Sequence, residues 1–534
     1  MNLTVLTKQV SVSDQIRAAD IETLASQGVK VIVCNRPDGE AADQPTLMEI
    51  SAIATEQRIE VINLPFAAGQ MSAELVSDFA ELLNSGERIH AYCRTGNRST
   101  QLFKAATGDA ATAVQQHITP ATKKAAANFD VAIIGAGAGG IAVSASLLKR
   151  NKNLRIALID PSNKHYYQPG WTMVGGGVFS AESTQRDTAT LIDRRASLIS
   201  ARVTQVSADE SKLLLDDGSE IHYQQLVVAP GLVINWGAIE GLEETLGKNG
   251  VTSNYRYDLA PYTWELVQQT QQGTAIFTQP PMPIKCAGAP QKALYLSADF
   301  WLKNKRLKNI KIDFCNAGGV LFGVPAYVDA LMTYIKKYRA DLSFNHNLIK
   351  VDGANRKAWF DVTDADGNKT QVCKEFDMLH VCPPQQAPEF IHASGLADQA
   401  GWLDVNPQTL RHSRYTNIWG LGDAMNTSNA KTMAAVRKQV PVVAANICAV
   451  QANREPLTTY DGYGSCPLTV ERGKIVLAEF CYGGRVAPTF PSWLNNGTKP
   501  TRLAWLLKAV GLPFVYWNMM LKGHEWFTDC PTEK

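Results

Sequence analysis

The sequence predicts an α/β protein with two separate modules, and three observations support this prediction. In residues 1–107, apolar strand-like runs such as VKVIVC and RIHAYC alternate with helix-like segments. A glycine-rich strand-turn-helix, NFDVAIIGAGAGG, opens a larger α/β region at residue 128. Between the two, large apolar residues give way to Ala, Thr and Lys, as in linkers. We therefore expect a small α/β domain over 1–107, a linker over 108–127 and a two-part α/β region beyond it.

The overall composition is that of an ordinary globular protein, and it disfavours several classes of function. The chain has 534 residues, 45% of them hydrophobic, and a formal net charge of +2, without the basic excess typical of nucleic-acid binding. Its ten cysteines include no CxxC pair, so neither a disulfide framework nor a metal site is expected. The first residues lack the apolar core of a signal peptide, and no uninterrupted apolar run is long enough to span a membrane. The sequence therefore predicts a cytoplasmic protein that binds no nucleic acid.

Cys93 is the first candidate for a chemical role, because it stands at the end of an apolar strand in HAYCRTGNRST. Tyrosine-phosphatase loops carry an arginine six positions after their cysteine, where this chain has Ser99. Arg94 and Arg98 instead give a shorter loop, whose N–H groups and cations suit a small anion or a persulfide. The loop resembles that of rhodanese sulfurtransferases, whereas the whole module, with CNRPDGE and LPFAAGQ, resembles the phosphatase-like domains found beside bacterial sulfur enzymes. These three residues are predicted to handle sulfur, while Asp38 is either a general acid or a turn residue.

The glycine-rich motif predicts a dinucleotide site of the Rossmann type. Its glycines follow a strand and open a helix, which makes a tight turn and places a pyrophosphate at a helix N-terminus. Asp160 ends the next strand, LRIALID, and is placed to bind a ribose hydroxyl. The predicted contacts from the motif itself are Gly135, Gly137, Gly139 and Gly140.

Two later motifs indicate which dinucleotide is bound. YTNIWGLGD is an apolar strand that ends in Gly-Asp, and it resembles the second FAD motif of flavoproteins with two dinucleotide-binding domains. LVVAPGL resembles the strand at which the chain leaves the FAD domain. We therefore expect FAD, held by a domain over 128–245 and 375–450. The predicted contacts from these later segments are Ala229, Gly231, Gly422, Asp423 and Lys431.

A second nucleotide-type unit is expected over 246–374. Its strand-turn-helix candidate, NIKIDFCNAGGVLFGVPAYVDALMTYI, lacks the GxGxxG pattern, so we do not expect it to bind NAD(P)H. In the same unit, three prolines stiffen the chain in TQPPMPIKCAG, and Lys285 offers a charge that stabilises a thiolate. Cys286 is therefore predicted to be a redox thiol.

Longer stretches resemble the type II sulfide:quinone oxidoreductases. They cover nearly all of 128–527 and include HYYQPGWTMVGGG, IKCAGAPQK, FGVPAY, MLHVCPP, YDGYGSCPL, VLAEF and PFVYWNMMLKG. The resemblance implies a membrane-surface flavoenzyme in which sulfide attacks a disulfide beside FAD, a persulfide forms, and ubiquinone reoxidises the flavin. It also implies that Cys286 is the first of the two cysteines.

One residue departs from that family's pattern. The second cysteine should follow the Gly-Asp of the FAD motif, where this chain has Ala424. Three explanations stay open: Cys315 or Cys382 replaces the missing thiol, Cys286 acts alone and passes sulfur to Cys93, or the flavoprotein has been repurposed.

The C-terminal region, 451–534, is predicted to meet the membrane and the quinone. In WLNNGTKPTRLAWLLKAVGLPFVYWNMMLKGHEWF, apolar runs alternate with Lys508 and Lys522, which resembles a monotopic anchor whose lysines meet lipid headgroups. A terminal helix packed on the core is the alternative. We expect peripheral binding to the inner face of the membrane, a ubiquinone-type electron acceptor and a small thiol as sulfur acceptor; homo-oligomerisation is left open.

Two alternatives from other classes of function also stay open. A phosphatase fused to a repurposed FAD oxidoreductase predicts hydrolysis of aryl phosphates that depends on Cys93. A sulfide or redox sensor predicts that FAD and Cys286 change state without turnover. The leading prediction is oxidation of sulfide or a persulfide with a quinone, with sulfane sulfur handled by the Cys93 domain.

Overall fold

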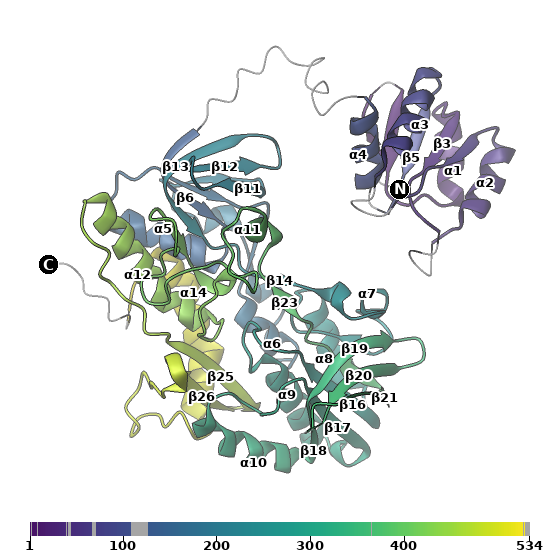
Figure 1. The fold of residues 1–534 in the computed structure, drawn as a ribbon. Helices are drawn as coiled ribbons and strands as arrows, with labels where there is room; N and C mark the ends of the chain where they lie inside the picture. Colours follow the sequence, from purple (N-terminus) through teal and green to yellow (C-terminus); the bar gives the residue numbers. More distant parts are fainter. Residues whose placement is uncertain are drawn as a thin grey trace. The chain divides into compact units, whose positions relative to one another are not determined.

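The structure is a computed structural model of the chain (Figure 1). The chain divides into two compact units, Met1–Lys123 and Lys124–Lys534. Both are α/β structures, which confirms the predicted class. The predicted linker over 108–127 lies, except for its last residue, outside the described part of the chain. The structure describes all residues except 2, 8, 39, 41–43, 67–70, 95, 108–126, 365, 527 and 529–534.

The N-terminal unit is a five-stranded sheet with the order β1-β2-β5-β3-β4, in which β2, β5, β3 and β4 are parallel and β1 pairs antiparallel with β2. Side chains alternate along each strand, so Val31 and Val33 of β3 enter one apolar cluster while Ile32 and Cys34 enter the other. Its elements are β1 (Thr4–Val5), β2 (Val10–Ser13), α1 (Ala18–Ser26), β3 (Val31–Cys34), α2 (Leu47–Glu56), β4 (Glu60–Asn63), α3 (Ala73–Asn84), β5 (Ile89–Tyr92) and α4 (Asn97–Ala106).

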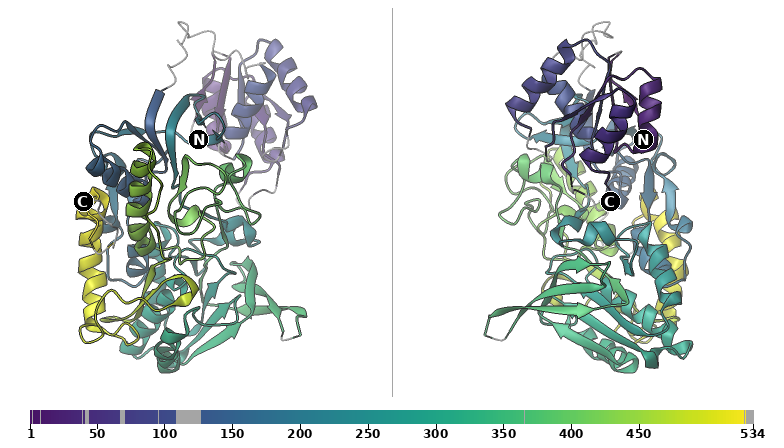
Figure 2. Two further views of the ribbon diagram at one scale, coloured as in Figure 1. Left: turned by 60° about the vertical axis from the view of Figure 1, so that its left-hand side comes forward. Right: turned by 90° about the vertical axis from the view of Figure 1, so that its right-hand side faces the viewer.

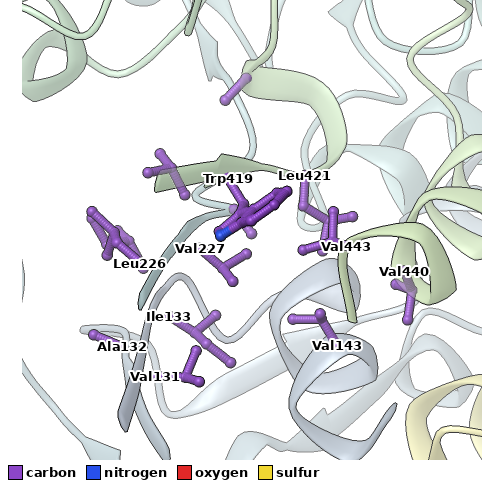
Figure 3. Packing of buried hydrophobic residues seen from close by; sticks show 14 of the residues in the cluster. Val131, Ala132, Ile133, Val143, Leu226, Val227, Trp419, Leu421, Val440 and Val443 are labelled. Carbon is purple, nitrogen blue, oxygen red and sulfur yellow. The ribbon is translucent and has the colours of Figure 1, made fainter. Parts of the chain in front are cut away.

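The first part of the larger unit is a sheet with the order β10-β7-β6-β13-β12-β11, with β24 paired to β13. Figure 3 shows its core, where strand residues such as Ile133 and Val227 lie near Val143 of α5 and Val443 of α12. The elements are β6 (Ala127–Ile134), α5 (Ala138–Arg150), β7 (Ile156–Ile159), β10 (Ser197–Ile199), β11 (Val203–Ser207), β12 (Lys212–Leu215), β13 (Glu220–Val228), β24 (Ile418–Gly420) and α12 (Met433–Gln451).

Among the described residues, α12 is the one helix long and apolar enough to cross a membrane. Its buried residues belong to the same core as the sheet and α5. We therefore assign α12 to the interior of this domain.

The second part of the larger unit is a parallel sheet with the order β15-β22-β16-β17-β18. A separate antiparallel sheet, β19-β20-β21, is inserted in the sequence between β18 and β22 of this parallel sheet. The elements are β15 (Val251–Thr252), α8 (Leu259–Gln269), β16 (Gly273–Gln279), α9 (Ala289–Lys303), β17 (Ile310–Asn316), α10 (Val328–Tyr338), β18 (Ala340–Phe344), β19 (His346–Asp352), β20 (Lys357–Thr363), β21 (Lys369–Glu375) and β22 (Met378–His380).

The C-terminal region is a hairpin followed by a helical segment. β25 (Gly464–Glu471) and β26 (Lys474–Phe480) pair, and the hydroxyl of Tyr338 in α10 donates to the carbonyl of Val470 in β25. α13 (Arg502–Leu506), a π-helical turn (Leu507–Gly511) and α14 (Leu512–Asn518) then follow one another without a break. Figure 2 shows this segment in yellow along one side of the larger unit.

The two faces of the C-terminal helical segment differ sharply. Ala504, Lys508 and Tyr516 are buried against the rest of the unit. Burial of Lys508 corrects the expectation that this lysine meets lipid headgroups, whereas Lys522 is exposed. The opposite face carries four apolar side chains that are 45–60% exposed, and we call this set the apolar stripe: Leu503, Leu506, Val510 and Phe514.

Candidate active site

The glycine motif forms a cradle at the C-terminal edge of the first sheet. Gly135 has φ +99°, and a Cβ atom at this position would lie 2.4 Å from the carbonyl oxygen of Ala229. A Cβ atom on Gly140 would overlap the Gly135 carbonyl oxygen at 1.8 Å. Around Gly137, by contrast, a Cβ atom would meet nothing within 4 Å, which leaves space before the N-terminus of α5. These residues therefore fit a dinucleotide whose phosphates lie at that helix end.

The other predicted cofactor residues follow strands of the same sheet. Asp160, after β7, accepts a hydrogen bond from the Ala136 N–H at 2.7 Å. A Cβ atom on Gly139 would lie 3.1 Å from the Leu421 side chain and 3.7 Å from that of Ala229, so three distant motifs meet here. The remaining predicted residues, Gly231 and Gly422, follow β13 and β24 and both have positive φ.

Lys431 connects the dinucleotide motif to the predicted redox cysteine. Its Nζ donates to the main-chain carbonyls of Asp423 at 2.8 Å and Met425 at 2.7 Å, and it lies 4.0 Å from the ring centre of Trp402. Burial lowers the pKa of Lys431 to about 8 and raises that of the Asp423 carboxyl. The carbonyl of Lys431 accepts a hydrogen bond from the Cys286 N–H at 2.9 Å. The structure thus brings the predicted residues Cys286, Asp423 and Lys431 together.

Cys286 forms a pair with Cys466. Their Sγ atoms are 3.7 Å apart, and both residues are free thiols. Cys286 precedes α9, whereas Cys466 lies on β25. Because a disulfide forms at about 2.05 Å, the thiols are close enough to pair after a small side-chain movement.

Two local features of the loop around Cys286 allow it to come close to Cys466 on β25. A Cβ atom on Gly288 would lie 2.5 Å from the Cys466 sulfur and 2.4 Å from the Leu468 side chain, so glycine is required for the loop to reach β25. Cys286 itself has φ +51°, a left-handed conformation that is uncommon outside glycine and concentrated at functional sites.

A buried lysine contacts the Cys286 sulfur. Lys292, in the first turns of α9, has its Nζ 3.0 Å from Cys286 Sγ. A hydrogen bond from the Cys466 thiol, together with the Lys292 charge, holds the pKa of Cys286 well below its usual value. The same hydrogen bond raises the pKa of Cys466, which therefore stays protonated as the donor. Burial alone would lower the pKa of Lys292, but the thiolate beside it raises that pKa above the ordinary lysine value.

Lys508 brings a second charge to the pair from the C-terminal segment. Its side chain is buried, and its Nζ lies 3.5 Å from the carbonyl oxygen of Pro169. Burial and the nearby Lys292 charge lower the pKa of Lys508 to about 7, while the two cysteines act in the opposite direction. A protonated Lys508 therefore adds positive potential around Cys286.

The two cysteines considered as substitutes for the missing thiol make other contacts. The sulfur of Cys315 lies 3.6 Å from the Nζ of Lys374, and burial raises the pKa of the Cys315 thiol to about 12. Cys382 belongs to the same apolar cluster as Cys286, and burial likewise raises its pKa to about 12. The sulfur at hydrogen-bonding distance from Cys286 is that of Cys466.

Sequence reasoning missed Cys466, Lys292 and Lys508 as site residues. Lys285, the charge expected to stabilise the thiolate, instead donates to Gln168 Oε1. The segments YDGYGSCPL and CAGAPQK do contain two of the missed residues, but nothing in their spacing shows that β25 lies beside the cysteine loop.

A pocket of about 310 Å³ lies next to the cysteine loop. Gln279 and Asn316, which end β16 and β17, line it at the edge where parallel sheets place ligands. Ile284 and Ala287, close to Cys286 on either side, also line it, together with the apolar residues Val320, Leu321, Phe322, Val324 and Phe480. A small molecule bound here would lie next to the loop that carries Cys286.

The Cys93 loop joins the central strand of the N-terminal sheet to α4. Cys93 is buried directly after β5, and its sulfur accepts a hydrogen bond from the Gly96 N–H at 3.1 Å. Gly96 caps α4 with φ +85°. Arg94 is exposed, whereas Arg98 is buried in the first turn of α4. The loop thus holds its sulfur at the C-terminal edge of a parallel sheet, as predicted for a site.

Arg98 is held by a carboxylate. Its guanidinium donates to both carboxylate oxygens of Glu40, at 2.6 and 2.7 Å, and to the Phe66 carbonyl at 2.7 Å. These bonds to Glu40, and more weakly the neighbouring Cys93, raise the pKa of Arg98. Asp38 accepts hydrogen bonds from the N–H of Leu47 at the start of α2, which favours its alternative role as a turn residue.

In comparisons with known proteins, different families match the two units of the chain. A family profile described as the phosphatase-like domain of beta-lactamase hydrolase-like protein matches residues 2–111, and one described as pyridine nucleotide-disulphide oxidoreductase matches 129–263. The mitochondrial sulfide:quinone oxidoreductase of Mus musculus is 38% identical over 74% of this chain and 87% of its own length. That of Dictyostelium discoideum is 40% identical over 74% of this chain and 86% of its own.

A solved structure shows the same fold. The sulfide:quinone oxidoreductase of Aquifex aeolicus superposes with a TM-score of 0.61 at 19% identity, covering 75% of this chain and 92% of that one.

Proposed function

Because this chain belongs to the sulfide:quinone oxidoreductase family, we propose that it oxidises sulfide at Cys286 and Cys466 and passes the electrons through FAD to a quinone. The observation that supports this assignment most strongly is the thiol pair, 3.7 Å apart and tied through Lys431 to the dinucleotide motif. FAD, when bound, takes two electrons from the cysteine site and gives them to the quinone. Cys466 then supplies the second thiol that Ala424 lacks.

The pKa difference within the pair sets the direction of sulfide attack. In the oxidised enzyme the two sulfurs form a disulfide, and hydrosulfide attacks one of them while the other leaves as a thiolate. Cys286 is the better leaving group, since its thiolate is stabilised by Lys292. The sulfane sulfur therefore forms on Cys466 as a persulfide. Transfer of this sulfur to an acceptor thiol leaves Cys466 as a thiol beside the Cys286 thiolate. Two-electron oxidation of the pair, for which a bound FAD would be the electron acceptor, would then restore the disulfide.

The proposal is tested by an anaerobic sulfide titration of the flavin-loaded protein, followed by a short-chain ubiquinone. Loss of flavin absorbance on adding sulfide, with repeated recovery on adding quinone, supports the enzyme. A flavin that stays oxidised contradicts the proposal, and one slow bleaching step without turnover favours a sensor instead.

We assign the entry of the sulfur acceptor to the pocket beside the cysteine loop. Its position near Ile284 and Ala287 supports this assignment, as does its mixture of an apolar lining with the polar ends of β16 and β17. A small thiol fits these requirements.

We further propose that the apolar stripe docks the enzyme on the inner face of the membrane, where it takes electrons to a ubiquinone-type quinone. Changing Leu506→Asp and Val510→Asp should weaken sedimentation with phospholipid vesicles roughly tenfold or more, because two exposed apolar side chains lose their burial in lipid. Leu457→Asp is the matched control, since Leu457 is 82% exposed outside the stripe. Equal sedimentation of stripe variant and control would contradict the docking proposal.

For the N-terminal domain we propose sulfur transfer at Cys93 in preference to phosphatase activity. The carboxylate of Glu40 on Arg98 supports this choice, because it opposes a phosphate dianion while leaving the Gly96 N–H to hold a sulfur anion. Tethering also raises the local concentration of Cys93 around the flavoprotein.

Cys93→Ser is expected to reduce thiosulfate:cyanide sulfur transfer to background, because the hydroxyl cannot carry a persulfide. The readout is thiocyanate formation by the full chain, with Cys34→Ser as a cysteine control in the same sheet. If the wild type instead hydrolyses an aryl phosphate in a Cys93-dependent manner, the phosphatase alternative is correct.

A further inference from the structure

A basic pocket lies at the start of the C-terminal helical segment. It has a volume of about 270 Å³ and is formed by residues of α9, α10, the β25–β26 turn and α13. Five cationic and two anionic side chains give it a net charge of +3. The residues that line it are Asp299, Leu302, Lys303, Lys337, Glu471, Arg472, Gly473, Lys474 and Arg502.

The two carboxylates of this pocket are already engaged. Asp299 accepts from Lys303 at 2.7 Å and from the Arg472 main-chain N–H at 3.0 Å. Glu471 pairs with Lys474 at 2.8 Å and also with Lys337. The lysines of the pocket are therefore largely neutralised by their partners.

The two arginines carry two of the three excess positive charges. Arg472 donates from its guanidinium to the Gly177 carbonyl at 3.1 Å, and no carboxylate among the described residues pairs with either Arg472 or Arg502. Both side chains are exposed. A guanidinium presents a planar fork of N–H donors that matches the oxygens of a phosphate.

The pocket adjoins the apolar stripe. Ile475 and Thr501 exchange two backbone hydrogen bonds, at 3.1 and 3.0 Å, which places Lys474 beside Arg502. Leu503, the first residue of the stripe, follows Arg502 directly, and Leu506 lies one turn further along. A surface that inserts apolar side chains into a membrane thus presents an anion pocket at its edge, at the level where lipid phosphates lie.

We propose that this pocket binds the phosphate headgroup of an anionic phospholipid, with Arg472 and Arg502 as its principal ligands. The inference rests on the proposed docking of the apolar stripe and goes beyond it by naming a lipid class. Leu302, 38% exposed, offers apolar contact for the glycerol or acyl part of the lipid. Charge complementarity selects an anionic lipid over a zwitterionic one.

The experiment compares binding of the full chain to vesicles of phosphatidylcholine alone and to vesicles that also contain phosphatidylglycerol. We expect phosphatidylglycerol to strengthen binding, and the double variant Arg472→Gln/Arg502→Gln to lose roughly 25-fold on these vesicles, about fivefold for each arginine. Binding to pure phosphatidylcholine should stay unchanged. The control is Lys152→Gln/Lys248→Gln, which removes two exposed cations elsewhere.

The outcomes separate the two proposals. Binding to both vesicle types with no gain from phosphatidylglycerol, or an equal loss in the control variant, overturns the headgroup site but leaves the stripe proposal standing. No binding to either vesicle type overturns the stripe proposal itself. If millimolar inorganic phosphate releases the protein from phosphatidylglycerol vesicles completely, the pocket is a free-phosphate site and the lipid assignment is wrong.

Discussion

Cys466→Ser is expected to reduce sulfide-dependent quinone reduction by roughly 10³-fold or more, because the serine hydroxyl can form neither the disulfide nor the persulfide. The fold should tolerate the change, since serine is close to cysteine in size, so the flavin spectrum and the thermal unfolding midpoint serve as checks. The rate is measured as loss of ubiquinone absorbance with sulfide as the electron donor.

The matched control is Cys382→Ser, in which a buried cysteine of the same apolar neighbourhood is changed. Its turnover should stay within about twofold of the wild type. The assignment of Cys466 is wrong if Cys466→Ser turns over at the wild-type rate, and above all if Cys382→Ser is the variant that loses turnover.

Lys292→Met should lower turnover by roughly 10- to 100-fold, the range expected for a lost charge-assisted hydrogen bond to a buried anion. Lys292 lowers the pKa of Cys286, so its removal must raise that pKa and reduce the fraction of thiolate at any given pH. The pH profile for alkylation of Cys286 in the reduced protein should therefore move to higher pH.

Two comparison variants make this prediction specific. Lys292→Arg keeps the positive charge, so the pH profile for alkylation of Cys286 should lie close to that of the wild type. Lys285→Met removes the lysine next to Cys286, whose ammonium donates to Gln168, and should shift the profile less. A Lys292→Met profile that coincides with the wild type would show that Lys292 has a structural role only.

Motifs with local spacing were predictable from the sequence. The glycines from Gly135 to Gly140 and the acidic Asp160 act through the geometry of one strand-turn-helix and its neighbouring strand, so their pattern alone indicates a dinucleotide. The position of Cys93 at the C-terminal edge of its sheet was likewise predictable, because strand ends in parallel sheets meet at one edge.

Residues whose role depends on tertiary contact were not predictable. Cys466 lies 180 residues from Cys286, on a strand that nothing in the local pattern connects to the cysteine loop. Lys508 stands in an apolar, broken helix, where burial and lipid contact give the same sequence pattern; packing against Pro169 decides between them. The packed core face and the exposed apolar stripe coexist on one helical segment, so the structure bears out core packing for one face, and membrane contact of the other stays a proposal.

The central claim is that Cys286 and Cys466 form the redox pair, and disulfide mapping tests it most directly. The flavin-loaded protein is oxidised with excess quinone, its free thiols are blocked at once, and it is digested with trypsin without reduction. We predict a crosslink between peptide 286–292, which contains Cys286, and peptide 455–472, which contains Cys466. A crosslink from peptide 286–292 to peptide 375–411, which contains Cys382, or a fully alkylated Cys286 in the oxidised protein, would contradict the account.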